Sequence, residues 1–288
     1  MSPSFFRAIV YPLVTFRPTY LLGMVFVRLA RKQKEKKVVS KRELVQIHNF
    51  MGSIKMEVDK NSYMGGTIYW CGFHHLSDLL YLRSFLKEDM TFVDVGANQG
   101  EFTLFAAKKL SKGKVIAFEP TPYQLGLLKK NILLNDFQNV DVNEYGLLDK
   151  EGEFNIYTTY ETELHSGQHE GLSSIFKSET RQEVEATVQL KVFDEEYFDS
   201  LERLDFVKID IEGAELPAMR GMVKTLKKFK PQLLIEMNKA TFEDAGYSMQ
   251  EVLDFLSELN YKPYNLYRGR IYAVESEKLK DLSNVIFK

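Results

Sequence analysis

Several common features are missing from this sequence of 288 residues. It has a single cysteine, Cys71, which excludes an intramolecular disulfide and fits a reducing compartment such as the cytoplasm. No Gly-Lys-Ser/Thr triplet closes a glycine turn, so the phosphate loop of nucleotide-hydrolysing enzymes is excluded. No repeat or low-complexity segment is present. With 44% hydrophobic residues, a chain of this length can bury one large α/β core and a modest appendage.

The N-terminal segment also lacks an apolar run of the roughly 20 residues that a membrane-spanning helix needs. Its apolar stretch, Phe5–Val27, is interrupted by Arg7, Pro12, Arg17 and Pro18. The basic residues at 28–37 follow this stretch instead of preceding it, so a secretory signal is not expected either. We therefore expect a cytoplasmic protein.

Charge is distributed unevenly along the chain. Residues 1–42 contain ten Lys or Arg and one acid, a balance of +9, so the remainder carries −11 for a net charge of −2. Two interpretations of residues 5–42 stay open. They form either an in-plane anchor on anionic lipid at the inner face of a membrane, or an arm that packs on the domain or on a second subunit. The sequence does not indicate the oligomeric state.

A strand, a glycine turn, a helix, a second strand and an acidic residue follow one another between residues 91 and 120. The first part is Thr91-Phe-Val-Asp-Val-Gly-Ala-Asn-Gln-Gly100, and the second is Lys114-Val-Ile-Ala-Phe-Glu-Pro120. In such a unit the glycines let the backbone pass close to a nucleoside, and a carboxylate at the tip of the second strand accepts both ribose hydroxyls. Glu119 is in the position for this role.

The charge of the turn distinguishes between nucleoside cofactors. A dinucleotide site has the pattern G-x-G-x-x-G and presents a helix N-terminus to a pyrophosphate. This turn has only Gly96 and Gly100, and Asp94 precedes it. A carboxylate there repels phosphate, but it attracts the sulfonium and ammonium of S-adenosylmethionine, directly or through backbone and water. We therefore expect S-adenosylmethionine as the cofactor.

Four segments of the sequence resemble the FkbM family of methyltransferases. They are Val93–Gly100, Phe118–Pro120, Asn131–Asn135 and, most specifically, Asp205-Phe-Val-Lys-Ile-Asp-Ile-Glu-Gly-Ala-Glu215. The resemblance covers roughly residues 60–240. It implies a class I methyltransferase fold and methylation of a hydroxyl oxygen on a sugar, glycolipid or polyketide-like acceptor. Gln99 is a mild departure, because the family commonly has a small hydrophobic residue there.

The residues expected to contact the cofactor lie in and shortly after this unit. They are Asp94, Gly96, Asn98, Gly100, Glu119, Pro120 and Leu147. The expected function is S-adenosylmethionine-dependent O-methylation of a sugar, a glycan or a related metabolite. Two other classes stay open: a non-catalytic module of the same fold that binds the cofactor or a glycan, and a nicotinamide-dependent oxidoreductase. Because the core is acidic, nucleic acid is not expected as a partner.

The segment Lys208–Glu215 contains the candidate catalytic residues. Asp210 ends a predicted buried strand, where open α/β sheets place their ligands, and Glu212 follows in the turn. Either carboxylate can accept the proton of an acceptor hydroxyl during methyl transfer, and either can instead orient the cofactor or cap a helix. Glu215 is expected in the first turn of a helix, where the helix dipole favours it, and Lys208 in an ion pair.

Glu236 ends the next predicted strand and is expected to converge with Asp210. Carboxylates at adjacent strand ends can hold Mg²⁺, which coordinates and acidifies a vicinal diol. No distinctive ligand spacing is present, so the sequence selects no metal.

From residue 91 the alternation of elements predicts an α/β domain over residues 89–288, with a mostly parallel sheet flanked by helices. Strands are expected near 91–95, 114–118, 139–145, 204–210 and 232–237, and helices near 100–111, 122–135, 215–228 and 248–259. Residues 261–267 and 271–274 are expected to form an antiparallel hairpin that closes the sheet. Capping-box patterns begin at Thr121 and Ser248.

Residues 1–88 are expected to form the arm and a cap on the substrate side. Ser40–Glu43 predicts a capping box that opens a helix through about Met51. Strand-like aromatic alternation is expected over Ile54–Phe73, around Gly65-Gly66, and a helix over 76–87.

Residues Thr158–Glu185 are irregular and predict a loop or lid before a strand that ends near Val192. His165 and His169 lie in this loop and are interpreted as solvated, because no H-E-x-x-H pattern is present. Gly171-Leu-Ser-Ser-Ile175 resembles a family segment near the substrate.

Overall fold

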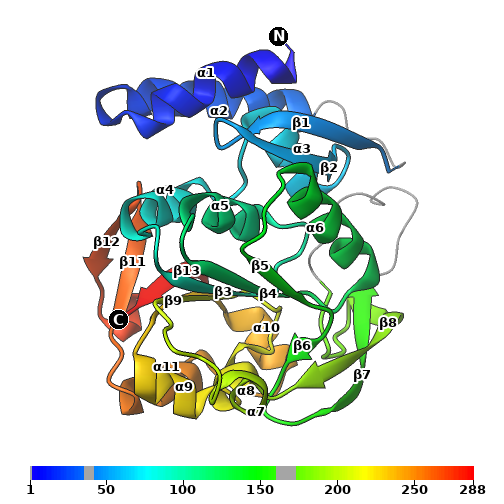
Figure 1. Cartoon of the computed structure of the whole chain (residues 1–288), viewed down its shortest axis with the longest axis vertical. Helices are drawn as coiled ribbons and strands as arrows, with labels where there is room; N and C mark the ends of the chain where they lie inside the picture. The colour runs from blue at the N-terminus through cyan, green and yellow to red at the C-terminus, as the bar shows by residue number, and fades with distance from the viewer. Residues whose placement is uncertain (1, 36–41, 160–172) are drawn as a thin grey trace.

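The computed structural model describes residues 2–35, 42–159 and 173–288. Its largest sheet has eight strands (Figure 1). In sheet order they are β12 (Arg270–Ala273), β11 (Pro263–Tyr267), β13 (Leu282–Phe287), β10 (Gln232–Asn238), β9 (Phe206–Ile209), β3 (Thr91–Val95), β4 (Lys114–Phe118) and β5 (Val140–Asn143). The neighbours from β10 to β5 pair in parallel, so the predicted class I methyltransferase sheet is confirmed.

Helices cover both faces of this sheet (Figure 1). One face carries α4 (Leu76–Phe85), α5 (Glu101–Lys109) and α6 (Pro122–Leu134), and the other carries α7 (Phe193–Tyr197), α8 (Glu215–Arg220), α9 (Val223–Phe229), α10 (Lys239–Asp244) and α11 (Met249–Glu258). Because side chains alternate across a strand, Phe92 belongs to the core under α4 and α5, whereas Val93 and Val95 belong to the core on the opposite face.

Two details of the helices differ from the prediction. The single helix expected over 215–228 is divided into α8 and α9 at Gly221, where an added Cβ would lie 2.3 Å from the carbonyl oxygen of Leu148. Ser248 forms the predicted capping box with Glu251. The capping prediction at Thr121 is wrong, because its side chain makes no capping hydrogen bond.

The C-terminal edge of the sheet contains a strand that the prediction lacks. The hairpin of β11 and β12 is confirmed. However, β13 lies between β10 and β11 and is antiparallel to both. Only its last residues, Val285–Phe287, are buried, and a buried run this short shows no period in the sequence.

A second, smaller sheet includes both ends of the predicted loop at 158–185. It consists of β6 (Gly146–Leu147), β8 (Arg181–Lys191) and β7 (Gly152–Thr159), in that order. The loop prediction is therefore wrong at both ends, because the segment starts and finishes inside a strand. His165 and His169, together with Gly171 and Leu172, lie outside the described residues.

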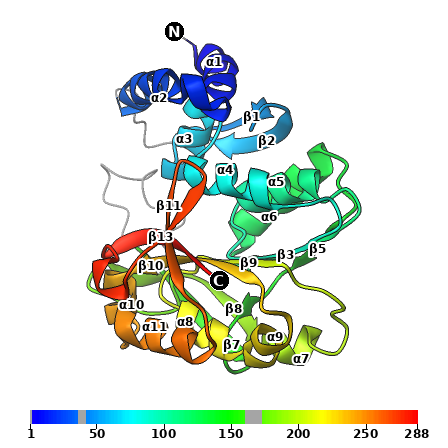
Figure 2. The same cartoon turned by 90° about the vertical axis from the view of Figure 1, so that its left-hand side faces the viewer.

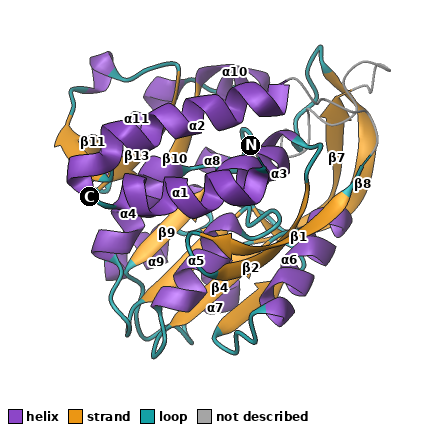
Figure 3. Ribbon diagram, turned by 90° about the horizontal axis from the view of Figure 1, so that it is seen from above, coloured by secondary structure: helices purple, strands orange, loops and turns teal. Residues whose placement is uncertain are grey.

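The N-terminal elements lie over the helices on one face of the large sheet (Figures 2 and 3). They are α1 (Pro3–Thr15), η1 (Arg17–Thr19), α2 (Tyr20–Glu35), β1 (Leu44–Phe50), β2 (Ile54–Asp59) and α3 (Tyr63–Cys71). Phe6, Val10 and Val14 recur on one side of α1 and are buried. They belong to one hydrophobic cluster that continues to Phe92 and Phe206 of the sheet. The arm and the sheet therefore share a core.

Two predictions in this region are wrong. The expected helix ending near Met51 is the strand β1, which pairs with β2 so that Ile47 lies opposite Met56. The turn between them uses positive φ angles at Met51 and Gly52, 42° and 98°. The expected strand to Phe73 is a strand only in its first part, after which α3 begins with Ser62 as its N-cap. The predicted helix over 76–87 is confirmed as α4.

Candidate active site

A cavity lies at the carboxyl ends of β3, β4 and β9, next to the small sheet. The empty space at this site, with the adjoining open solvent included, is about 730 Å³. Seven of the predicted site residues line it: Gly96, Asn98, Glu119, Pro120, Leu147, Asp210 and Glu212. The structure places Asp94 and Gly100 outside the lining.

The turn after β3 touches the turn after β9 at Gly96. This glycine has a φ of 79°, and an added Cβ would lie 2.1 Å from the carbonyl oxygen of Asp210. The neighbouring turn therefore requires a glycine here even without a ligand. Asn98 follows with a φ of 50°, a region that asparagine tolerates, and Gly100 is the N-cap of α5.

Glu119 is held by the backbone on both of its oxygens. Oε2 accepts a hydrogen bond from the Asn98 N–H and Oε1 accepts one from the Thr121 N–H, each at 2.8 Å. Burial raises the pKa of this carboxyl, and the two N–H groups partly offset the shift. The two bonds fix the orientation of Glu119, and each oxygen keeps a lone pair that can accept from a ribose hydroxyl.

Asp94 and Lys208 form a buried ion pair that reaches the cavity through Asp210. Asp94 is 0% exposed, and its Oδ2 accepts a hydrogen bond of 2.6 Å from the Thr103 hydroxyl. Lys208 Nζ lies 3.6 Å from Asp94 Oδ1 and 3.5 Å from Asp210 Oδ2, and it donates to the Gly96 carbonyl at 2.7 Å. The predicted ion pair of Lys208 is present. Asp94 acts on the cavity through this ammonium and not by lining it.

Three carboxyl groups form an acid cluster beside the cavity: Asp210, Glu212 and Glu236. Each offers an oxygen within 4.8 Å of the others. The structure thus places Glu236 beside Asp210, as expected from the positions of both residues in the sequence. Burial and repulsion within the cluster raise the pKa of both Glu212 and Glu236. Arg181 offsets part of this for Glu212, with its Nη1 3.9 Å from Oε2. Glu212 and Glu236 therefore keep protons at a pH where isolated glutamates have lost them.

Glu215 supports the turn that carries the acid cluster. Its two oxygens accept hydrogen bonds of 2.9 Å from the backbone N–H groups of Ile211 and Gly213. It is the first residue of α8, as predicted, and burial raises its pKa to about 7. Glu212 lies within this turn with a φ of 52°, so the bonds to Glu215 help to hold it in the left-handed region.

The sequence matches the Methyltransferase FkbM domain over residues 94–263. The chain belongs to this methyltransferase family. The match includes every candidate residue from Asp94 to Glu236.

Several proteins are similar to this FkbM methyltransferase. Methyltransferase sdnD of Sordaria araneosa is 26% identical over 205 residues, which cover 60% of this chain and 79% of that protein. Methyltransferase 1 of Beauveria bassiana is 26% identical over 148 residues, which cover 47% of this chain and 59% of that protein. Among solved structures, Methyltransferase FkbM from Methylobacillus flagellatus KT is 15% identical with a TM-score of 0.46, and the match covers 74% of this chain and 47% of that one. A Streptococcus mutans protein described as a methyltransferase, solved in complex with SAH, is 13% identical with a TM-score of 0.42. This match covers 73% of this chain and 93% of that one.

Part of the cavity of this FkbM methyltransferase comes from residues that the sequence analysis did not single out. These are chiefly Gln124, Ile156, Leu190 and Ile211. Ile156 and Leu190 come from the small sheet, whose strands β7 and β8 are separated by a long segment, so no local pattern joins them. Ser173–Ile175 also line the cavity, which places this part of the predicted substrate-side segment beside Glu212.

The lining of the FkbM methyltransferase cavity suits a nucleoside without phosphates. Gln124 Oε1 is a buried acceptor with no hydrogen-bond partner among the described residues, and Glu119 has lone pairs to spare. Leu147 and Ile211 supply apolar surface. Among the described lining residues none is Lys or Arg, so a pyrophosphate would meet carboxylates instead of countercharges.

Proposed function

We propose that this chain is an S-adenosylmethionine-dependent methyltransferase that methylates a hydroxyl oxygen on a sugar, a glycan or a related metabolite. The observation that carries the proposal is that Glu119 shares one cavity with two members of the acid cluster, Asp210 and Glu212. Glu119 follows β4 and Asp210 follows β9, on either side of β3. The two strand ends are therefore separated by two strand spacings, about 10 Å, which leaves room for a nucleoside and an acceptor between them.

Asp210 is the proposed proton acceptor. S-adenosylmethionine supplies an electrophilic methyl group when it is bound. As the acceptor oxygen gains the methyl group, its proton passes to the Asp210 carboxylate, whose side chain lines the cavity and is 23% exposed. The raised pKa of Glu212, which also lines the cavity, suits this group to holding a proton and orienting the acceptor, with Glu236 beside it in the acid cluster.

The acid cluster also favours a particular class of acceptor. Carboxylates accept hydrogen bonds, and a protonated carboxyl also donates one. A polyhydroxylated acceptor offers several O–H donors in a small volume, whereas an apolar acceptor would offer the cluster no hydrogen-bond donor. This is the reason for proposing a sugar or glycan hydroxyl.

Calorimetry with S-adenosylmethionine, S-adenosylhomocysteine and NADH tests the cofactor. We expect the first two to bind. Removing a hydrogen bond from a charged group costs about 1.5–3 kcal/mol, so Glu119→Ala should weaken both by about 10- to 100-fold. Glu153→Ala, an exposed carboxylate on β7, is the matched control and should bind normally. If only NADH binds, the result would contradict the proposal and favour a nicotinamide-dependent oxidoreductase.

An acceptor screen with methyl-labelled S-adenosylmethionine tests the reaction. We expect label in a sugar or glycan fraction that resists mild alkali, because a methyl ether survives where a methyl ester is hydrolysed. Alkali-labile label would assign a carboxylate acceptor. Glycan binding with no transfer to any acceptor would support a non-catalytic module of the same fold.

We also propose that α2 contacts the surface of a membrane. Leu21, Leu22, Val25 and Leu29 are between 42% and 64% exposed. At 100° per residue they occupy about one third of the helix circumference, opposite the buried Val27 and Ala30.

The charge near this apolar face indicates which surface it suits. The exposed Arg28, Arg31 and Lys32 lie beside and after Leu29 in the second half of α2, and residues 1–42 carry +9. Apolar side chains followed by basic ones fit the acyl boundary and headgroups of an anionic bilayer. No helix in the described part of the chain is long and apolar enough to cross a membrane. The contact proposed is therefore peripheral.

A further inference from the structure

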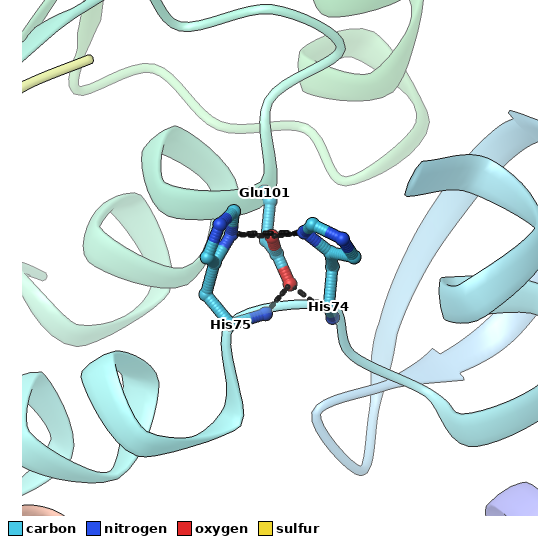
Figure 4. A group of neighbouring side chains, drawn as sticks. All are labelled: His74, His75 and Glu101. Carbon is cyan, nitrogen blue, oxygen red and sulfur yellow. Dashed lines mark hydrogen bonds and ion pairs between the residues drawn. The ribbon is translucent and has the colours of Figure 1, made fainter. Parts of the chain in front are cut away.

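His74, His75 and Glu101 form a second cluster of polar side chains, outside the cavity (Figure 4). The two histidines connect α3 to α4, and Glu101 is the first residue of α5. Figure 4 shows the two imidazoles on either side of the Glu101 carboxylate. Neither the FkbM match nor the proposed methyl transfer accounts for this arrangement, since the histidines precede the matched residues.

Three potential ligand atoms face one another in this cluster. His75 Nδ1 lies 2.8 Å from Glu101 Oε2 and 3.2 Å from His74 Nδ1, and His74 Nδ1 lies 4.0 Å from Glu101 Oε2. A point about 2.0 Å from all three atoms lies in the plane of this triangle, at the Zn–N and Zn–O distances of about 2.0–2.2 Å in proteins. A tetrahedral ion would draw His74 Nδ1 and Glu101 Oε2, now 4.0 Å apart, closer together.

The backbone holds these ligand atoms in place. Glu101 Oε1 accepts hydrogen bonds from the backbone N–H groups of His74 and His75, which directs Oε2 to the imidazoles. The His75 ring packs on Phe102 and the His74 ring on Tyr63, with ring centres 5.3 Å apart in both cases. The backbone and the two aromatic rings therefore hold the three ligand groups in place without an ion. In known metal sites, hydrogen-bond partners around the ligands have the same effect.

All three atoms can direct a lone pair at a bound ion. In the absence of an ion, His75 Nδ1 and Glu101 Oε2 share a hydrogen bond of 2.8 Å. An ion at the centre replaces that proton and takes one lone pair from each of the three atoms.

We propose that His74, His75 and Glu101 bind a divalent first-row transition-metal ion of the Zn²⁺ type. Imidazole nitrogens select such ions over Mg²⁺, which prefers an all-oxygen set such as the acid cluster provides. Two histidines and one glutamate are a set that zinc enzymes use while leaving a fourth position for water or substrate. The histidine side chains are 17% and 19% exposed and the glutamate 2%, so an ion reaches the site from the imidazole side.

The metal site lies close to the proposed catalytic residues. The Phe102 ring, which contacts His75, also lies 5.4 Å from Lys208 Nζ, and Lys208 pairs with Asp210. One aromatic ring therefore separates the ion from the ammonium beside the acid cluster. The inference of metal binding does not depend on the proposed methyl acceptor.

Zn²⁺ titration of the full-length chain, stripped with a chelator and freed of any histidine tag, tests the proposal. We expect about one Zn²⁺ per chain, by calorimetry and by metal analysis after dialysis. His74→Phe keeps an aromatic ring against Tyr63 and removes one ligand. Loss of a hydrogen-bond partner of a ligand weakens metal binding by about 10- to 100-fold. His74→Phe and Glu101→Gln each remove a ligand, so both should weaken Zn²⁺ binding by more than this.

Two control variants locate the bound ion. His48→Gln removes an exposed histidine of β1, and Glu236→Gln alters the acid cluster; both should bind Zn²⁺ as the wild type does. Loss of binding in Glu236→Gln but not in His74→Phe would place the ion at the acid cluster and overturn the proposal. No Zn²⁺ bound by the wild type, or equal loss in His48→Gln, would overturn it as well.

A second measurement does not depend on a variant folding. The wild-type chain loaded with Co²⁺ should show the strong visible absorption of a four- or five-coordinate ion with nitrogen ligands, and Zn²⁺ should displace it. The weak spectrum of a six-coordinate Co²⁺ would contradict the proposed ligand set.

Discussion

The ammonium nitrogen of Lys208 lies 3.6 Å from Oδ1 of Asp94. Both side chains are buried, with 4% of Lys208 and none of Asp94 exposed. Burial raises the pKa of Asp94, and the charge of Lys208 partly reverses this shift. The carboxylate therefore depends on the lysine to stay ionised inside the protein.

Lys208→Met should leave Asp94 as an unpaired carboxylate in the core. We expect it to lower the free energy of unfolding by about 3–5 kcal/mol, measured by urea denaturation. Lys112→Met is the matched control, because Lys112 pairs with Glu88 at the surface, and its stability should be nearly unchanged. Similar losses in both variants would show that the buried pair has no special importance.

Gly96→Ala should be harmful because its Cβ would lie 2.1 Å from the Asp210 carbonyl at a φ of 79°. We expect a loss of about 1–3 kcal/mol together with weaker cofactor binding, read from melting curves with and without S-adenosylhomocysteine. Gly126→Ala is the control, since nothing lies within 4 Å of its added Cβ on α6. It should stabilise the protein by about 0.5–1 kcal/mol. A normal melting temperature for Gly96→Ala would mean that the two turns separate easily.

Asp210→Asn should lower turnover by about 10²- to 10⁴-fold with little change in cofactor affinity, if Asp210 accepts the proton. Glu212→Gln should lose less, because the amide resembles the protonated acid that the raised pKa of Glu212 favours. Measured kcat, KM and cofactor affinity of the two variants decide the assignment. The reverse order would make Glu212 the base, and turnover restored by Mg²⁺ after chelation would make the acid cluster a metal site.

Stability should fall as the pH rises above the ordinary range of glutamate. The folded protein keeps protons on Glu212 and Glu236, whereas the same residues titrate near about 4.3 in an unfolded chain. Between these values the folded state binds more protons, so the melting temperature should decrease from about pH 5 upward through the raised pKa values.

The double variant Glu212→Gln with Glu236→Gln should show a flatter melting curve against pH than the wild type. Some slope should remain up to about pH 7, because Glu215 has a pKa raised to about 7 and is still present. The exposed-site variant Glu88→Gln should follow the wild type. Parallel curves for the double variant and the wild type would contradict the prediction that Glu212 and Glu236 keep their protons in the folded state.

Leu21→Glu with Val25→Glu should release the protein from anionic vesicles in a co-sedimentation assay. Wild-type binding should weaken with salt, because part of it comes from screened charge. Leu133→Glu is the control: Leu133 is 75% exposed on α6, far from this face in the sequence. Surface variants are preferable to deletion of the arm, since Phe6 and Val10 are buried in the shared core. Wild-type protein that stays in the supernatant at low salt would end the membrane proposal.

The elements that the sequence predicts well are those whose signal is local. Asp94 and Glu119 could be placed at strand ends because Asp94 lies in a short apolar strand just before the Gly96 turn, and Glu119 directly follows the next short apolar strand. Lys208 could be assigned an ion pair because it alternates with apolar neighbours on a buried strand. The helix expected to end near Met51 shows the opposite case: its capping pattern is local, whereas pairing of β1 with β2 decides the outcome.

The remaining site residues depend on contacts between distant segments. Gln124 looks like part of a helix start, and only the fold shows that its side-chain oxygen lies in the cavity without a partner among the described residues. His74 and His75 are 26 or more residues from Glu101, a spacing that fits no metal motif. Their proximity results from α4 and α5 packing side by side, which local patterns do not reveal.

The position of β13 affects how the protein folds as it is synthesised. The ribosome produces β10 and β11 first, and β13 then has to enter the space between them. Until it does, both strands present unpaired backbone edges, which are the kind that join other chains. Completion of the sheet must wait for β13 to leave the exit tunnel, so a nascent chain stalled just before it should be prone to aggregation and bound by chaperones.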